Sequence, residues 1–276
     1  MDNTSGSFTN AVNAGLGPLI GNGRTAEVFA WGDGQVLKLY RAGMPAQWVA
    51  DEARVGRIVV DAGLAAPAVG DIVELDGRLG VVYERLDGPS MLDYMAGHPA
   101  EIPALGRQFA ELHAQMHDCN RPELPSQRAG FVAAIEYAPQ LSAALKQAAL
   151  RQLSGLADGQ AVCHGDYHPG NLVMTRRGPL VIDWMSARCG NPVADVARTT
   201  LMFRMARVPE YYSAETQQAL ELARRSFYET YLSAYLTRRP FAVEEIEAWI
   251  PVLAAARLSE NIAEEEADLL KLVEVL

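Results

Sequence analysis

Residues 164–184 read HGDYHPGNLVMTRRGPLVIDW. Asp166 precedes Asn171 by five residues and Asp183 by seventeen. Two short apolar runs, LVM and LVI, fill the interval between Asn171 and Asp183, and a turn that contains Gly-Pro separates them. This pattern predicts two short strands joined by a turn. Such a hairpin would return Asp183 to the neighbourhood of Asn171.

The two carboxylates and the amide at these spacings suit the transfer of a phosphoryl group. That reaction needs little covalent help, but it needs a positioned acceptor hydroxyl and neutralisation of the phosphate charge. Asp166 would orient the hydroxyl and take its proton. Asn171 and Asp183 would offer oxygen ligands to Mg²⁺, which prefers hard oxygen donors alongside substrate phosphates. The alternative is a polar loop between two core strands, and the number of matched positions argues against it.

The pattern H-x-D-x-x-x-x-N followed by I-D-W resembles the catalytic and metal loops of the protein-kinase-like superfamily. The fuller spelling HGDxHPGN is similar to that of the aminoglycoside phosphotransferase branch, which includes choline, homoserine and antibiotic kinases. The resemblance covers about residues 15–274. It implies an α+β, bilobal protein-kinase-like fold, in which a small antiparallel-sheet lobe with one helix precedes a larger, mainly helical lobe. We expect a disordered tail at residues 1–12, a nucleotide-binding lobe at 13–86, and a catalytic and acceptor-binding lobe at 87–276.

The resemblance implies a nucleotide site in the first of these lobes. Gly21 and Gly23 lie between two predicted strands, where they would let the backbone approach phosphates, and Val28 would lie against the adenine. The third glycine of protein kinases falls at Ala26, and a simple hairpin turn would look the same. No G-x-x-x-x-G-K sequence occurs, so a Walker-type NTPase is not supported.

Four further residues are assigned to nucleotide binding by the resemblance. Lys38, in an alternating apolar strand, would hold the α- and β-phosphates, and Glu52 would fix its side chain. The alternative is a surface lysine and a solvated glutamate. An Asp-Gly turn predicts a hairpin whose second strand ends near Glu84. The backbone of Glu84 and Leu86 would read the adenine.

Helical spacing follows this hairpin, and three of its polar residues are interpreted as structural. His113 and His117 are four residues apart, which would allow a metal site, but no carboxylate is placed as in H-E-x-x-H. We therefore interpret both as packing residues. The resemblance implies that Asp195 ties its helix to the catalytic loop. His164 is interpreted as a scaffold residue rather than as the general base.

The acceptor site is assigned to the carboxy-terminal region. Residues 211–276 contain twelve acidic and six basic residues, which favours a cationic acceptor. Helices expected at 214–239 and 243–273 would wall the site, and by analogy with aminoglycoside enzymes its substrate-binding residues would be Glu260, Asn261, Glu264 and Glu265. Ordinary solvation of helix faces gives the same pattern.

Only twelve residues separate Asp183 from Asp195, too short a segment to seat a peptide as a protein kinase does.

The composition is that of an ordinary globular chain, with 276 residues, 49% hydrophobic and 21% charged. A net charge of −10 argues against nucleic acid as a partner. The polar amino terminus lacks the features of a signal peptide, and no apolar run is long enough to span a membrane. Three cysteines form neither a disulfide framework nor a zinc spacing. We expect a cytoplasmic location and favour a monomer.

The sequence thus predicts a kinase that uses ATP or GTP with Mg²⁺ to phosphorylate a hydroxyl of a small, cationic molecule. An aminoglycoside is the first candidate, with antibiotic resistance as the role. A metabolic amino-alcohol kinase or a macrolide kinase of the same fold is the first alternative. A catalytically silent nucleotide-binding sensor is an alternative of another class, and a protein kinase is a third.

Overall fold

The computed structural model describes residues 16–276. The predicted disordered tail at residues 1–12 lies outside this range. The described chain divides into two compact units, one formed by residues up to Pro89 together with Leu172–Met185, and the other by Ser90–Asn171 together with Ser186–Leu276. Within residues 16–276, we find no helix whose length and apolar character would let it cross a bilayer.

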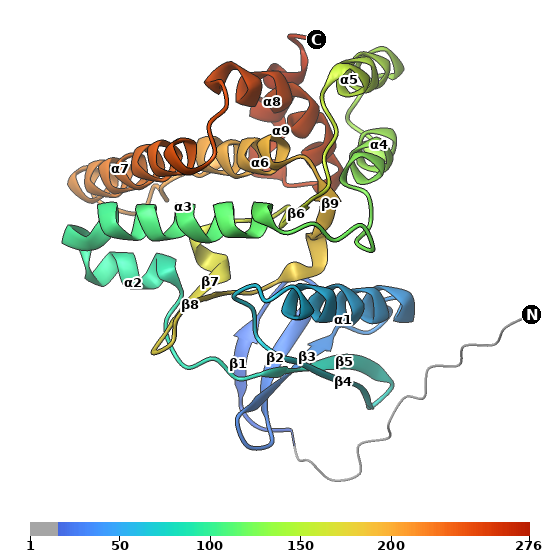
Figure 1. Ribbon diagram of the computed structural model, residues 1–276, viewed down its shortest axis with the longest axis vertical. Coiled ribbons are helices and arrows are strands. Elements are labelled where there is room, and N and C mark those ends of the chain that lie inside the picture. The colour runs from blue at the N-terminus through green and yellow to red at the C-terminus, as the bar shows by residue number, and fades with distance from the viewer. Residues whose placement is uncertain (1–15) are drawn as a thin grey trace, which may run out of the picture. The chain divides into compact units, whose positions relative to one another are not determined.

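The first unit is built on a five-stranded antiparallel sheet with the order β1-β2-β3-β5-β4. Its strands are β1 (Leu19–Asn22), β2 (Ala26–Trp31), β3 (Gln35–Tyr40), β4 (Val69–Leu75) and β5 (Arg78–Glu84). Figure 1 shows helix α1 (Ala46–Asp61) alongside this sheet. The predicted turn between β4 and β5 is confirmed, because Asp76 and Gly77 both adopt the positive φ of a tight hairpin turn.

The alternation of side chains along β3 gives each face of the sheet its own core. Tyr40 packs with Val49 and Ala53 of α1, whereas Leu37 and Leu39 pack on the opposite face. Because every second residue of a strand points to the same face, the face of Tyr40 is also the face of Lys38. The strand therefore directs one cation toward α1.

The predicted hairpin after Asn171 is confirmed as β7 (Leu172–Thr175) and β8 (Gly178–Val181), with Leu172 paired to Val181. The turn lies within the expected stretch, residues 175–179, but it is shorter than expected. Gly178 and Pro179 lie in β8, and the turn is formed by the two arginines before them. The Thr175 hydroxyl closes this turn by accepting from the Arg177 amide at 3.1 Å and donating to the Gly178 carbonyl at 2.7 Å.

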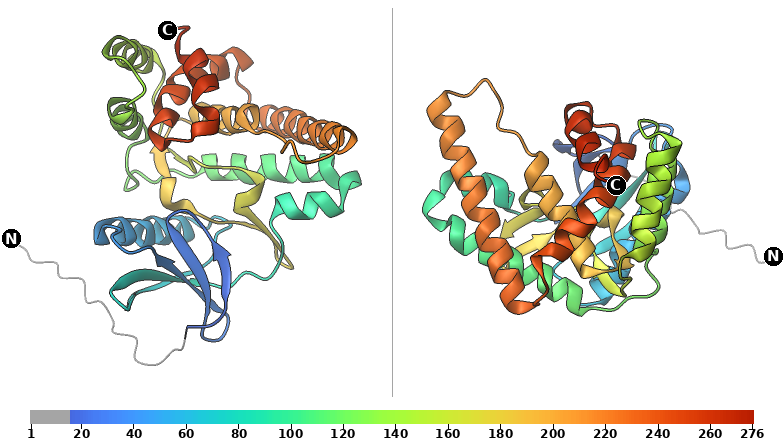
Figure 2. Two further views of the ribbon diagram at one scale, coloured as in Figure 1. Left: turned by 180° about the vertical axis from the view of Figure 1, so that it is seen from behind. Right: turned by 90° about the horizontal axis from the view of Figure 1, so that it is seen from above.

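The second unit is mainly helical. Its helices are α2 (Met91–Gly97), α3 (Ile102–Asp118), α4 (Gln127–Tyr137), α5 (Ala143–Gly155), α6 (Pro192–Met205), α7 (Ala214–Arg238), α8 (Val243–Arg257) and α9 (Ala263–Val273). Strands β6 (Ala161–Cys163) and β9 (Arg188–Gly190) form a short antiparallel pair. Helices α3 and α7 lie side by side (Figures 1 and 2), and a Cβ atom at Gly106 would come 3.0 Å from the Phe227 carbonyl.

The expected helix at 214–239 corresponds to α7, but the single helix expected at 243–273 is wrong. It is divided into α8 and α9 by a 3-10 turn, Leu258–Glu260, and by Asn261. Asn261 has a φ of 54°, a left-handed conformation that ends a helix and that asparagine adopts more readily than most residues. The expected α+β architecture, a small antiparallel sheet with one helix followed by a helical part, is confirmed.

Candidate active site

The Lys38 ammonium group lies between two carboxylates of the first unit. Its Nζ is 2.7 Å from Glu52 Oε1 and 2.9 Å from Asp183 Oδ1. Burial lowers the pKa of Lys38, but the charges of Glu52 and Asp183 outweigh burial and raise it above its ordinary value. Lys38 is therefore a fixed cation. This contact joins three residues that the sequence assigned to nucleotide and metal binding.

Glu52 is held by two tyrosines as well as by Lys38. The Tyr83 hydroxyl donates to Glu52 Oε1 at 3.0 Å, and the Tyr40 hydroxyl donates to Oε2. Burial, followed by the Glu52 charge, raises the pKa of Tyr83 well above its ordinary value, so the phenol stays a donor. Only 3% of Glu52 is exposed, which contradicts its interpretation as a solvated helix residue.

Asp183 differs from Glu52 in its backbone and in its exposure. Its φ of 64° lies in the left-handed region, which is strained for a residue other than glycine and is found preferentially at functional sites. Its side chain is 44% exposed although Oδ1 accepts from Lys38. The second carboxylate oxygen would suit a hard metal ion such as Mg²⁺.

The glycine turn connects β1 and β2, and β2 pairs with β3 on its other side. Gly21 pairs with Val28 across the two strands, and the Gly23 amide donates to the Ala26 carbonyl at 2.9 Å. Val28 pairs in turn with Lys38. The register thus places Val28 directly across from Lys38, and Gly21 one strand further from it.

Arg41 stabilises this turn by hydrogen bonds, a role that its position in the sequence does not indicate. Its Nη2 donates to Asn22 Oδ1 at 2.7 Å and to the Gly23 carbonyl at 2.9 Å, and its Nε donates to the Arg24 carbonyl at 3.0 Å. The Arg41 amide also donates to the Thr25 carbonyl at 2.9 Å. The only signal in the sequence was a cation directly after a strand, which is too common to assign a role.

The end of β5 is fixed by contacts within the first unit. The Glu84 amide donates to the Ala68 carbonyl at 2.9 Å, and the Arg85 amide donates to the Gly34 carbonyl at 2.9 Å. Arg177 in the β7–β8 turn pairs with the Glu84 side chain. Because the Glu84 amide is already used, the predicted contact of Glu84 with adenine is restricted to its carbonyl. The amide of Leu86 stays a predicted donor.

The residues of the predicted catalytic loop, in the second unit, form a compact hydrogen-bonded set. Asn171 Nδ2 donates to the Asp166 carbonyl at 2.9 Å and to Asp166 Oδ2 at 3.2 Å. The amide group of Asn171 is thereby oriented, and its Oδ1 is the atom that would coordinate a metal ion. His168 Nε2 lies 3.7 Å from the same Asp166 oxygen, and its Nδ1 accepts from the Gly170 amide at 3.1 Å.

Asp166 is ionised across the physiological pH range. Partial burial raises its pKa, but the hydrogen bond and charge of His168, with the charges of Arg198 and His164, lower it to about 2. A carboxylate with so low a pKa is a weak base that is always ready to accept a hydrogen bond. The side chain is 36% exposed, so a ligand can reach it.

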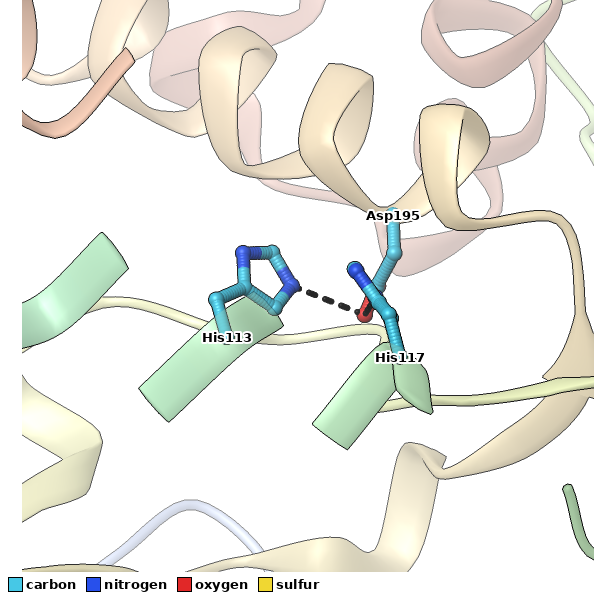
Figure 3. Close-up of side chains that lie close together, drawn as sticks. All are labelled: His113, His117 and Asp195. Carbon is cyan, nitrogen blue, oxygen red and sulfur yellow. Dashed lines mark hydrogen bonds and ion pairs between the residues drawn. The ribbon is translucent and has the colours of Figure 1, made fainter. Parts of the chain in front are cut away.

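Asp195 anchors the backbone before Asp166. Its Oδ2 accepts from the His164 amide at 2.6 Å, and its Oδ1 accepts from the Gly165 amide at 2.8 Å. His113 Nε2 and His117 Nε2 also lie 3.1 and 3.2 Å from Oδ2 (Figure 3). Burial raises the pKa of Asp195, but the two histidines hold it well below its ordinary value.

The second nitrogen of each of these histidines contacts a tyrosine of α7. His113 Nδ1 is 2.9 Å from the Tyr231 hydroxyl, and His117 Nδ1 is 2.5 Å from the Tyr235 hydroxyl. Two histidines and a carboxylate this close would suit a metal ion by ligand type. Each imidazole nitrogen, however, has a hydrogen-bond partner, and Asp195 accepts from backbone amides. The arrangement is accounted for as a buried hydrogen-bond network.

Protonation of His113 is expected to make stability depend on pH. Burial and then the neighbouring His117 lower its folded-state pKa to about 3, against about 6.5 for an unfolded histidine. The unfolded chain therefore binds the proton more readily between these values, and folding is weakened as the pH falls below about 6.5. This one group should contribute a slope of about 1.4 kcal/mol per pH unit to the free energy of unfolding.

Denaturant unfolding between pH ~7 and ~5 measures this slope. The variant His113→Gln should flatten it, whereas His98→Gln, which replaces an exposed histidine, should leave it unchanged. Equal slopes for wild type and His113→Gln would contradict the assignment.

The four residues predicted to bind the acceptor lie near the end of the second unit, and arginines already occupy two of them. Glu260 pairs with Arg198 and, at 3.2 Å, with Arg257 Nη1. Glu265 accepts from Arg257 through both oxygens. Asn261 Oδ1 accepts from Gln140 Nε2 at 2.9 Å, and Glu264 is exposed in the first turn of α9. These contacts depend on tertiary packing, so no local pattern in the sequence predicts them.

Comparison with known proteins identifies the family. The model of the phosphotransferase enzyme family matches residues 18–235, which is most of the chain. No curated protein sequence matched. Among solved structures, a thermostable mutant of aminoglycoside phosphotransferase APH(4)-Ia is similar with a TM-score of 0.61 and 17% identity, covering 94% of this chain and 92% of that one.

Two further structures show the same fold at low identity. The streptomycin–ATP–APH(2'')-IIa ternary complex has a TM-score of 0.59 and 15% identity, covering 93% of this chain and 92% of that one. The macrolide 2'-phosphotransferase MphH from Brachybacterium faecium has a TM-score of 0.52 and 18% identity, covering 91% and 88%. The expected kinase-like fold and the expected phosphotransferase activity are confirmed. The chain belongs to the phosphotransferase enzyme family.

Proposed function

We propose that this phosphotransferase moves the γ-phosphate of ATP or GTP to a hydroxyl group of a small molecule, with Mg²⁺ as the metal ion. The observation that carries the proposal is the position of the Lys38 ammonium group, 2.7 Å from Glu52 and 2.9 Å from Asp183. Through these two contacts, residues from β3, from α1 and from the segment after β8 form one charged group. A cation fixed beside an exposed carboxylate is suited to hold phosphates together with a metal ion.

The residues of the chain divide the reaction between them. Lys38 would bind phosphate oxygens of the nucleotide, and Asp166 would accept a hydrogen bond from the acceptor hydroxyl. In the transfer step the acceptor oxygen forms a bond to the γ-phosphorus while the bond to the β–γ bridging oxygen breaks. The diphosphate leaves with the nucleotide, and the hydroxyl proton passes to Asp166 and then to water. A weak base suffices because the transition state is loose and the proton leaves late.

The metal ion would be held by oxygen donors, which are the ligands that Mg²⁺ prefers. Asp183 would offer a carboxylate oxygen. Asn171 would offer its Oδ1, because its Nδ2 already donates hydrogen bonds to Asp166. When bound, the ion supplies neutralisation of charge on the phosphates. The choice between ATP and GTP would depend on the backbone of Glu84 and Leu86.

A small acceptor is supported by the short segment that follows Asp183. Only a 3-10 turn, Trp184–Ser186, and the three-residue strand β9 precede α6. The segment offers no platform for an extended peptide.

The acidic carboxy-terminal region predicted a cationic acceptor such as an aminoglycoside, with antibiotic resistance as the role, and amino-alcohol or macrolide acceptors as the alternative. A cytoplasmic location, where ATP and Mg²⁺ are available, and a monomeric state are part of the proposal.

Formation of nucleoside diphosphate tests the function. With ATP and Mg²⁺, release of ADP should rise when a pool of hydroxyl-bearing small molecules is added, and EDTA should abolish the rise. ADP release that is independent of added acceptors would contradict the proposal and would indicate an ATPase instead. Nucleotide binding without any ADP release would support the silent sensor.

Removal of Arg41 should weaken nucleotide binding without changing the chemical step. Arg41→Ala deletes three hydrogen bonds that hold the glycine turn, at a net contribution of about 0.5–1.5 kcal/mol each. We expect KM for ATP to rise about tenfold or more, with kcat nearly unchanged. Steady-state kinetics measure this split. Arg54→Ala, at a half-exposed position on α1, is the matched control, and an unchanged KM in Arg41→Ala would contradict the role.

A further inference from the structure

Gly165, the residue before Asp166, is held by hydrogen bonds at both of its peptide groups. Its amide donates to Asp195 Oδ1 at 2.8 Å, and its carbonyl accepts from Arg198 Nε at 3.3 Å. Gly165 has a φ of 78°, and a Cβ atom at this position would come 2.8 Å from the Ser186 carbonyl oxygen. The turn therefore requires glycine, and this residue has no side chain that could anchor the loop.

The contact with Arg198 bears on Asp166, because it involves the peptide group that joins Gly165 to Asp166. A peptide group is planar, so the direction of its carbonyl also sets the direction of the Asp166 amide. Gly165, Arg198 and Glu260 all line a cavity of about 160 Å³. Close packing is incomplete beside Gly165, so its carbonyl depends on the hydrogen bond from Arg198 for its orientation.

Arg198 lies on α6 and is oriented by the end of the segment that follows α8. Its Nη2 pairs with Glu260, and only 11% of the Arg198 side chain is exposed. Because a guanidinium group is planar and rigid, the contact at Nη2 also sets the direction of Nε. The two contacts of Arg198 are thus coupled: Glu260 turns the guanidinium group so that Nε faces the Gly165 carbonyl.

Glu260 is held in turn by Arg257, whose Nη1 lies 3.2 Å from its second carboxylate oxygen. Arg257 also donates to both oxygens of Glu265 on α9, with 2.7 Å between Nη2 and Oε1. The side chains of Arg257 and Glu265 are only 9% and 15% exposed, so water and salt screen this pair weakly. Alternating charges therefore run from α9 to the loop, in the order Glu265, Arg257, Glu260 and Arg198.

We propose that Arg198 is a positioning residue for phosphoryl transfer, and that Glu260 acts through Arg198 rather than by touching the acceptor. This role rests on the proposed function. A misplacement of reacting groups by about 1 Å can cost about 10²-fold in rate, so a contact that places Asp166 acts on kcat. A Glu260 that bound the acceptor would act on KM for the acceptor instead.

Three variants separate these two roles. Arg198→Met removes the donor to the Gly165 carbonyl and keeps much of the length of the side chain. It leaves no unpaired carboxylate, because Glu260 still has Arg257 at 3.2 Å. Glu260→Gln keeps the shape of its side chain and removes the charge that orients Arg198. The third variant combines the two substitutions.

Arg204→Met is the matched control. Arg204 also lies on α6, and its Nη1 donates to Glu247 Oε2 of α8 at 3.0 Å. Like Arg198, it ties α6 to the α8 region by an ion pair. Its loss therefore reports what the loss of such a pair does to the fold in general.

The full-length chain is assayed with radiolabelled ATP, Mg²⁺ and kanamycin, erythromycin or choline, and kcat and both KM values are measured with the acceptor that wild type phosphorylates. Unfolding by denaturant is followed for each variant. Hydrogen exchange of the amides in residues 161–172 is measured in parallel by mass spectrometry. The exchange reads the opening of the loop and needs no acceptor.

We expect Arg198→Met to lower kcat by about 10–100-fold, with KM for ATP within about twofold of wild type. Glu260→Gln should also lower kcat, with KM for the acceptor nearly unchanged. The double variant should lose no more than Arg198→Met alone, because Glu260 acts only through Arg198. Exchange in residues 161–172 should be faster in all three variants and unchanged in Arg204→Met.

Three results would overturn the inference. The first is a wild-type kcat in Arg198→Met. The second is a raised KM for the acceptor in Glu260→Gln with kcat unchanged, which would make Glu260 an acceptor-binding residue. The third is a double variant in which the two losses multiply, since the residues would then act independently.

Two further outcomes are also decided by these measurements. If Arg198→Met fails to fold, the milder variant Glu260→Gln decides by its kcat and its exchange. If wild type transfers no phosphate to any acceptor, the proposed function fails. The exchange data then still decide whether Arg198 holds the loop, and equal exchange in wild type and Arg198→Met would overturn that role separately.

Discussion

Replacing Asp166 with asparagine is expected to lower kcat for phosphoryl transfer by about 10²–10⁴-fold, because the group that accepts the hydroxyl proton is lost. Nucleotide affinity should stay within about twofold, since Lys38 and Asp183 are untouched. The substitution is nearly isosteric. The oxygen of the new amide can still accept from Asn171 Nδ2, which lies 3.2 Å from Asp166 Oδ2.

Rapid-quench or steady-state measurement of product formation reads this effect, with nucleotide binding followed separately by calorimetry. Glu111→Gln, an exposed acid-to-amide change on α3, is the matched control. A kcat for Asp166→Asn close to that of wild type would remove Asp166 from the mechanism. A loss of nucleotide affinity equal to the loss of rate would indicate a misfolded loop instead.

Removal of the Asp195 carboxylate is expected to lower the free energy of unfolding by about 3 kcal/mol or more, because each buried donor left unsatisfied costs about 1–3 kcal/mol. Asp195→Ala would leave four buried donors without an acceptor: the His164 and Gly165 amides, His113 Nε2 and His117 Nε2. Each such donor has lost its bond to water and gains nothing in return.

Chemical denaturation followed by circular dichroism measures this loss. Asp87→Ala is the matched control, because Asp87 is 85% exposed and its surface pair with Arg85 contributes less than about 1 kcal/mol. Asp195→Ala should also lower kcat, since Asp195 holds the backbone that leads to Asp166. A variant as stable as the control would contradict the view that this network organises the catalytic loop.

The sequence predicts best where local spacing carries the chemistry. The interval from Asn171 to Asp183 was enough to predict the β7–β8 hairpin, because apolar runs and turn residues are local signals. The alternation of β3 likewise indicated that Lys38 stands apart from its apolar neighbours, and the structure places its ammonium group 2.7 Å from Glu52.

Contacts between residues that are distant in the chain could not be predicted from the sequence. Arg41 holds a turn that lies seventeen or more residues earlier, and nothing in its neighbours marks it. Arg257 neutralises Glu265 only because Asn261 turns the chain between α8 and α9, whereas a continuous helix was expected. The acidic composition of the carboxy-terminal segment predicted a cationic acceptor, but two of its glutamates, Glu260 and Glu265, pair with arginines.

The central claim is that the chain transfers a phosphoryl group from a nucleotide to a small acceptor through Asp166. The most direct measurement is mass spectrometry of the acceptor pool after incubation with ATP, Mg²⁺ and either wild type or Asp166→Asn. We predict an acceptor whose mass has increased by one phosphate in the wild-type sample and is nearly absent with the variant. Equal amounts of phosphorylated product from both proteins, or none from a wild type that binds ATP, would contradict the account.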